Sequence, residues 1–190
     1  MSAFEHVTAL LSFVYALALT HLLARIAELI VARDRVKFSG LLTLGMVNAI
    51  LLVFVNWLSL WDLRSVTNWD IASIAIQFLF AVSVYVVCAL VGPKVPDEGA
   101  LDLEDFFWRQ RFYFYGAIVL CLILALLANL DFLKTANTAL LLKENLGTIA
   151  ILVPSVAGLI SRNSVVQWVA GVCLLVLTIG FAIMFSSSLG

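Results

Sequence analysis

Apolar residues in this chain fall into long blocks separated by short polar stretches. Five blocks contain no Asp, Glu, Lys or Arg: residues 7–23, 38–61, 71–92, 112–130 and 165–185. About 18 or more apolar residues in a helix cover the roughly 30 Å hydrocarbon core of a bilayer. The pattern therefore predicts an all-α integral membrane protein, with the lipid bilayer as its first partner.

The blocks predict a polytopic bundle of six transmembrane helices in a single domain, residues 1–190. The spans are expected at about residues 4–31, 38–61, 71–92, 104–130, 138–161 and 165–186. The fifth span is the weakest, because Lys143 and Glu144 lie near its start and Pro154 lies inside it. Proline removes a hydrogen bond within a helix, so we expect a kink near Pro154. A re-entrant or interfacial segment is the alternative for this stretch.

Composition agrees with this interpretation and excludes other classes. The chain is 64% apolar and 12% charged, and its mean hydropathy is +1.12. A net charge of −1 without a basic stripe gives no nucleic-acid-binding signature. The three cysteines lie in apolar blocks without a paired motif, and we expect them to pack as small hydrophobic residues. Residues 1–23 lack a basic leader and a cleavage site, so they are expected to form a retained span.

The distribution of basic residues predicts an orientation. Six spans place the first, third and fifth connections on one face of the membrane. The basic residues expected there are Arg25, Arg33, Arg35, Lys37, Lys94, Arg109, Arg111 and Arg162. The other face has only Arg64, Lys134 and Lys143. Because basic loops stay in the cytoplasm, we predict that both termini are non-cytoplasmic.

The entrance to the fourth span has its own signals. Asp102 is expected to cap a helix that begins at Leu103, with Asp105 three residues later as in a capping box. Asp105 and Arg109 then lie at positions i and i+4. Aromatic residues crowd around the arginines here, which is typical of a bilayer–water interface.

The first span contains a candidate functional group of three residues, His21, Arg25 and Glu28, on one face of the helix. Ionisable residues at membrane depth are functional candidates by default. One interpretation is a vestibule in which His21 titrates near neutral pH and Arg25 holds an anionic group. The structural alternative is that Arg25 pairs with Glu28 or reaches the headgroups, while His21 bonds to a neighbouring helix.

Amide side chains occur in the second and third spans. Asn48 and Asn56 lie on similar sides of the second helix, and Gln77 lies in the third. Amides within spans usually bond across helices. The same groups would also suit a narrow polar path.

Several chemistries are excluded by spacing. His6 and His21 would lie about 22 Å apart along one helix, so they cannot share a metal or a haem within the chain. Motifs for a catalytic triad, a zinc hydrolase or a phosphate-binding loop are missing from the sequence. We therefore expect no enzyme activity, no cofactor and no metal site.

Three segments resemble an uncharacterised family of small bacterial multi-spanning inner-membrane proteins. They are FEHVTALLSFVYALALTHLL (4–23), NWLSLWDLR (56–64) and LDLEDFFWRQRFYFYGA (101–117). The shared features are a Thr-His-Leu-Leu ending that includes His21, a Trp-rich turn after the second span, and an acidic, aromatic and arginine-rich start of the fourth. The resemblance implies a bacterial inner-membrane location and about six helices, and it brings no activity with it.

Two functions remain open from the sequence. The first is a small transporter or channel lined by polar groups of helices 1–3, which predicts that His21, Asn48, Asn56 and Gln77 converge on one cavity. The second is a non-catalytic accessory or assembly subunit of a membrane complex. A homo-oligomer or a second membrane protein is compatible with either function.

Overall fold

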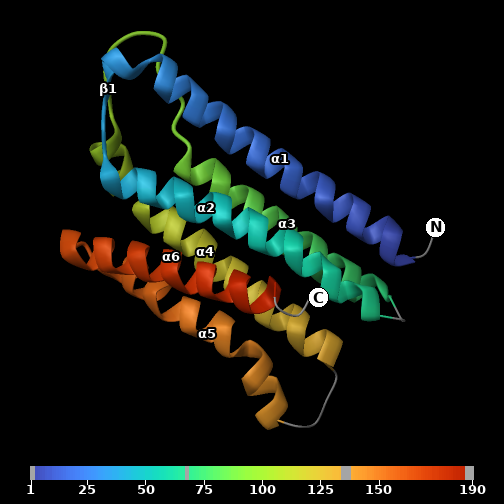
Figure 1. Ribbon diagram of the computed structural model, residues 1–190. Helices are drawn as coiled ribbons and strands as arrows, with labels where there is room; N and C mark the ends of the chain where they lie inside the picture. Colours follow the sequence, from blue (N-terminus) through green and yellow to red (C-terminus); the bar gives the residue numbers. More distant parts are fainter. Residues whose placement is uncertain (1–2, 67–68, 134–137, 187–190) are drawn as a thin grey trace.

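The computed structural model describes residues 3–66, 69–133 and 138–186 (Figure 1). The six α-helices of these residues are α1 (Ala3–Val31), α2 (Gly40–Ser59), α3 (Ile71–Val91), α4 (Leu103–Leu133), α5 (Thr138–Ile160) and α6 (Ser164–Ser186). Between them lie the 3-10 helices η1 (Arg33–Arg35) and η2 (Leu60–Ser65) and the two-residue strands β1 (Val36–Lys37) and β2 (Leu101–Asp102). The predicted all-α class is confirmed.

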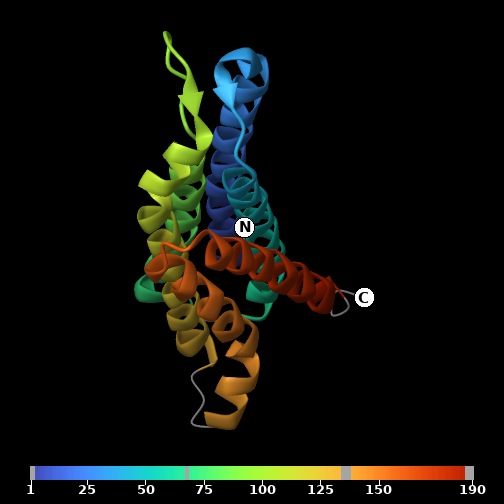
Figure 2. The same cartoon turned by 90° about the vertical axis from the view of Figure 1, so that its left-hand side faces the viewer.

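The helices run back and forth along the bundle (Figure 1). The α1–α2, α3–α4 and α5–α6 connections lie at one end, which we call the basic end because it holds the larger set of lysines and arginines. The start of α1 and the α2–α3 connection lie at the opposite end. Helix α3 packs against α1 and α4, α4 against α5, α5 against α6, and α6 against α2. Figure 2 shows that α6 is inclined to α1 and points away from it.

Length and apolar character qualify five helical segments to cross a membrane. They are Ala3–Val31, Gly40–Arg64, Ile71–Val91, Leu103–Leu130 and Ser164–Met184. In α5, Asn145–Ile160 is a shorter apolar helix. Helix α5 continues past Pro154 to Ile160. The chain is thus a membrane protein by its helices, while a sixth span and a kink at Pro154 stay predictions.

The long helices divide into an inward and an outward apolar face. On α1 the buried side chains include Leu11, Tyr15 and Leu22, whereas Phe13 and Leu17 are exposed. Exposed large apolar side chains also lie along the other helices. Helices that are apolar on both faces suit a lipid environment, because lipid replaces water as the solvent of the outer face.

Polar side chains cap the helices where the chain enters the bundle. The Ser39 hydroxyl accepts a hydrogen bond from the Leu42 amide at 3.4 Å, and the Asp70 carboxylate accepts one from the Ser73 amide at 2.7 Å. Asp102 accepts bonds from the amides of Glu104 and Asp105 at 2.9 and 3.1 Å. The predicted Asp102 cap is confirmed, and caps of this kind satisfy backbone N–H groups that the first helical turn leaves free.

Candidate functional site

The three candidate residues of α1 lie near the basic end and make short-range contacts. The His21 ring packs against the Tyr85 ring of α3, with centroids 5.8 Å apart. Arg25 Nη1 donates to both carboxylate oxygens of Glu28, at 2.9 and 3.1 Å. The pairing of Arg25 with Glu28 that the structural alternative expected is therefore present. The stem of Arg25 also lies against Gly92, where an added Cβ would come within 3.0 Å of Arg25 Cγ.

The amide candidates divide between different helix contacts. Asn48 is buried, and its Nδ2 donates to the Gly171 carbonyl of α6 at 3.0 Å. Asn56 instead donates to the Leu52 carbonyl of its own helix at 2.7 Å. Gln77 is buried on α3. The expected bond across helices is thus seen for Asn48, and Asn56 differs because a carbonyl one turn earlier is within reach of its side chain.

Of the six sequence candidates, the described contacts bring together only Arg25 and Glu28. His21 packs against α3, whereas Asn48 bonds to α6. The cavity beside Asn48, described below, includes none of the other five candidates in its lining.

A second cluster, which sequence reasoning did not single out, surrounds Arg111 of α4. Its side chain is 5% exposed. Arg111 Nη1 lies 2.7, 2.9 and 2.6 Å from the carbonyl oxygens of Gly158, Leu159 and Ser161, at the end of α5. The last carbonyls of a helix have no partner within it and carry partial negative charge, so a buried cation stabilises them.

Gln167 of α6 completes this cluster from the other side. It is fully buried, and its Nε2 donates to the carbonyls of Gly158 and Ser161 at 2.8 and 2.6 Å. The Tyr115 ring lies so close to Gly158 that an added Cβ would be 2.5 Å from the ring. We call Asn48, Arg111, Tyr115, Gly158 and Gln167 the buried junction; it joins α2, α4, α5 and α6.

The buried junction borders a small cavity between α2, α4 and α6. Its volume, counted as the space open to the centre of a water molecule, is about 10 Å³. Asn48, Tyr115 and Gln167 are among its lining residues. Asn48 Oδ1 and Gln167 Oε1 are both buried and have no hydrogen-bond partner among the described residues.

A larger hollow lies at the opposite end of the bundle, between α1 and the end of α2. It has about 240 Å³ by the same measure and is open to the outside. Phe4, Trp57 and Trp61 contribute aromatic walls, and Thr8 and Ser12 contribute hydroxyls. The Thr8 hydroxyl already donates to the Phe4 carbonyl at 2.7 Å. This groove is mainly apolar, as expected for a surface that faces lipid.

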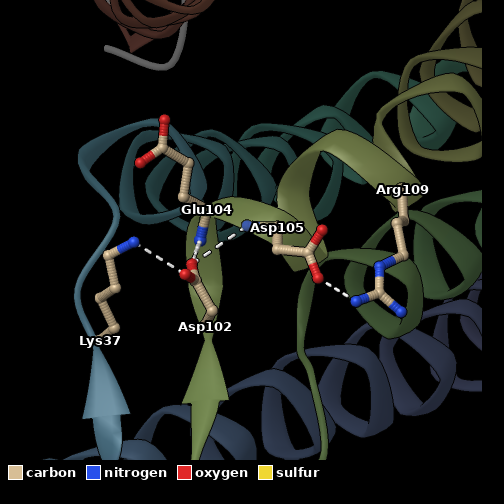
Figure 3. A network of polar contacts seen from close by, with 5 residues as sticks. All are labelled: Lys37, Asp102, Glu104, Asp105 and Arg109. Atoms are coloured by element: carbon tan, nitrogen blue, oxygen red, sulfur yellow. Dashed lines mark hydrogen bonds and ion pairs between the residues drawn. The ribbon is translucent and has the colours of Figure 1, made fainter.

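The exposed charges at the basic end form a third cluster, of which Figure 3 draws Lys37, Asp102, Asp105 and Arg109 together with Glu104. Strand β1 pairs in parallel with β2, so that Lys37 lies beside Asp102. Lys37 Nζ is 2.8 Å from Asp102 Oδ2, and Arg109 bonds to Asp105 one turn away. Arg35 donates to the Asp97 carbonyl at 3.1 Å. We call Arg35, Lys37, Asp102, Asp105 and Arg109 the surface platform.

Charge pairing shifts the pKa values of Lys37 and Asp102, which lie outside the membrane-spanning segments. The hydrogen bond from Lys37, followed by those from two backbone amides, lowers the pKa of Asp102. The hydrogen bond to Asp102 and its negative charge raise the pKa of Lys37. Both groups therefore stay charged at neutral pH. Asp105 pairs with Arg109 and does not reach back to the Asp102 amide, so the capping box is only half formed.

The sequence contains part of the information needed to find the buried junction. The sequence predicts Arg111 only as one of the basic residues on the face of the α5–α6 connection, and the structure adds that its side chain is buried against the end of α5. Arg111 and Tyr115 share a helical face, and the glycine and end of α5 leave room for both. The sequence around Arg111 and Tyr115 does not show that Arg111 meets Gly158, because the two residues are 47 positions apart.

Comparison of the chain with protein-family models, curated proteins and solved structures gives no match. A metal site is not apparent either: the residues that the structure describes contain no group of three or more His, Cys, Asp and Glu side chains able to hold a metal ion.

Proposed function

We propose that this protein is a non-catalytic accessory or assembly subunit of a membrane complex. The observation that carries the proposal is the use made of the polar residues within the bundle. His21 packs on Tyr85, Asn48 bonds α2 to α6, and Arg111 holds the end of α5. Each contact stabilises the fold at a different place, and such groups would be needed in any rigid helical scaffold.

The surface platform is the part best suited to meet a partner. Its strands tie the α1–α2 and α3–α4 connections together, and ion pairs hold its side chains. A charged surface that is already ordered loses less conformational entropy on binding. Residues beside it, such as Arg33 and Asp34, are exposed and available for contact.

The orientation and location belong to the same proposal. We infer from the positive charges of the basic end that the platform is cytoplasmic and both termini are non-cytoplasmic, and we propose α5 as a sixth span kinked near Pro154. The resemblance to a family of small bacterial multi-spanning proteins supports an inner-membrane location.

Native mass spectrometry of the protein, gently extracted from its own membranes, tests the proposal. We expect a complex with another polypeptide at fixed stoichiometry. Arg33→Glu at the basic end should weaken this complex, while Arg64→Glu at the opposite end should leave it intact. Repeated recovery of the protein alone or as a homo-oligomer would contradict the proposal.

A small transporter or channel is the second candidate function, favoured by the buried polar side chains of Asn48 and Gln77 within the apolar bundle. This function predicts flux of a small polar solute into liposomes that contain the purified protein, and its loss in an Asn48→Leu variant that remains folded. A His21→Ala variant would test the vestibule of α1 in the same assay. Solute flux no faster than in protein-free liposomes would remove this candidate.

A further inference from the structure

The cavity of the buried junction is lined by Asn48 and Gln167, whose side-chain oxygens are buried without a hydrogen-bond donor among the described residues. We propose that it holds one water molecule, which donates one hydrogen bond to Asn48 Oδ1 and one to Gln167 Oε1. The water would thereby join α2 to α6 next to the direct bond between Asn48 and Gly171. This inference concerns the interior of the bundle and does not depend on the function proposed above.

The orientation of both amides is fixed by their nitrogen atoms. Asn48 Nδ2 donates to the Gly171 carbonyl, and Gln167 Nε2 donates to the carbonyls of Gly158 and Ser161. Turning either amide over would place its oxygen against a carbonyl oxygen, which is repulsive. The two side-chain oxygens must therefore remain as acceptors.

Both acceptors are removed from bulk solvent. Asn48 is 7% and Gln167 0% exposed, and neither oxygen receives a bond from any described residue. An acceptor without a donor is costly in an apolar interior, so buried polar atoms are nearly always satisfied by protein or by water. Two donors are needed, and one water molecule supplies two.

The size of the cavity fits this occupant. A cavity holds a water when it can accommodate one water-sized sphere, which occupies about 10–15 Å³. This cavity leaves about 10 Å³ open to the centre of such a sphere, so a water fits. A larger polar solute would have to displace the aromatic rings of Phe107, Phe114 and Tyr115, which also line it.

The charge of the surroundings favours water over a small cation. Arg111 donates to the same Gly158 carbonyl as Gln167, so its guanidinium group lies close to the site. No described carboxylate forms an ion pair with Arg111. A second positive charge here would be repelled in a medium of low dielectric constant, whereas a neutral water would not.

Hydroxyl-radical footprinting by X-ray radiolysis tests the proposal, because bound water generates radicals beside the side chains it touches. Tyr115 and Tyr15 form a matched pair: they are 3% and 2% exposed, and only Tyr115 lines this cavity. In the intact wild-type protein we expect Tyr115 to be oxidised several-fold faster than Tyr15. Equal rates would overturn the proposal.

The double variant Asn48→Leu, Gln167→Met removes both acceptors. Its Tyr115 should be oxidised as slowly as Tyr15, while Asn56→Leu, which changes an amide bonded within α2, should leave the Tyr115 rate unchanged. Fast oxidation of Tyr115 in a folded double variant would contradict the proposal. If the double variant does not fold, the wild-type comparison of the two tyrosines still decides.

A second measurement separates water from a cation. The thermal unfolding midpoint of the wild type should be the same in sodium, ammonium and choline chloride at equal ionic strength. A saturable rise in sodium or in ammonium would show that the site binds that cation, and the proposal would then be wrong.

Discussion

The surface platform and the buried junction both contain arginines and both join segments distant in sequence, yet they satisfy charge differently. In the platform, Lys37 meets Asp102 and Arg109 meets Asp105, at positions open to solvent. In the buried junction, Arg111 meets backbone carbonyls at the end of α5. Exposed ion pairs contribute little to stability, because water solvates the separated charges almost as well.

The difference lies in what would be left after one partner is removed. Loss of a platform side chain leaves its partner in water. Loss of Arg111 leaves the Leu159 carbonyl without its side-chain donor and leaves the Gly158 and Ser161 carbonyls with Gln167 as their only side-chain donor. Backbone carbonyls that lose a donor inside the bundle are expensive to leave unsatisfied. The buried junction should therefore dominate stability, although the platform has more formal charge.

The largest effect is expected from Arg111→Met. It removes the cation while keeping much of the side-chain volume, and we expect a loss of about 2–4 kcal/mol in the free energy of unfolding. Unfolding in detergent, followed by circular dichroism, measures this loss. Arg109→Met on the same helix is the matched control, and its midpoint should not move. An equal loss of stability in the two variants would contradict the larger contribution that we assign to the buried junction.

Gly158→Ala should come next, because the new Cβ would lie 2.5 Å from the Tyr115 ring. Overpacking of this kind costs about 1–3 kcal/mol. At Gly116 the nearest atom is 3.8 Å away, so Gly116→Ala should be neutral or slightly stabilising. Adding Tyr115→Leu to Gly158→Ala should recover part of the loss. A Gly158→Ala variant as stable as wild type would show that the ring moves away at little cost.

A smaller effect is expected from Asn48→Leu, which removes one hydrogen bond between α2 and α6. Bonds of this type contribute about 0.6–2 kcal/mol in membrane proteins. Asn56→Leu should cost less, because Asn56 bonds only to its own helix. Chemical unfolding of both variants gives the comparison, and a greater loss for Asn56→Leu would contradict it.

The smallest effect concerns the Lys37–Asp102 pair and pH. Asp102 has a lowered pKa, so its contribution is present above the pKa of a free aspartate and is lost as the pH falls through the lowered value. Lys37 has a raised pKa, so its contribution is lost only as the pH rises through that value. Spin-label distances between the two loops should therefore stay constant from about pH 5 to pH 9. A change centred near pH 7 would contradict this assignment.

The sequence by itself determined the class of protein and the limits of most helices. Uninterrupted apolar blocks of this length predict helices that lie in lipid. Local rules for helix caps and for residues one turn apart predicted the Asp102 cap and the Asp105–Arg109 pair. The pairing of Arg25 with Glu28 could also be predicted, because residues three apart on a helix are neighbours whatever the rest of the fold is. These features depend on interactions within one or two turns.

Only the tertiary structure decided which polar residues meet between helices. The sequence shows Arg111 beside aromatic residues in a pattern typical of a membrane interface, and its burial follows from the packing of α5 against α4. The contacts of Asn48 with Gly171 and of Gln167 with Gly158 likewise depend on the tilt and register of α6. Hydrophobic periodicity does not specify tilt or register in helices that are apolar on every side, because lipid and protein neighbours are equally apolar.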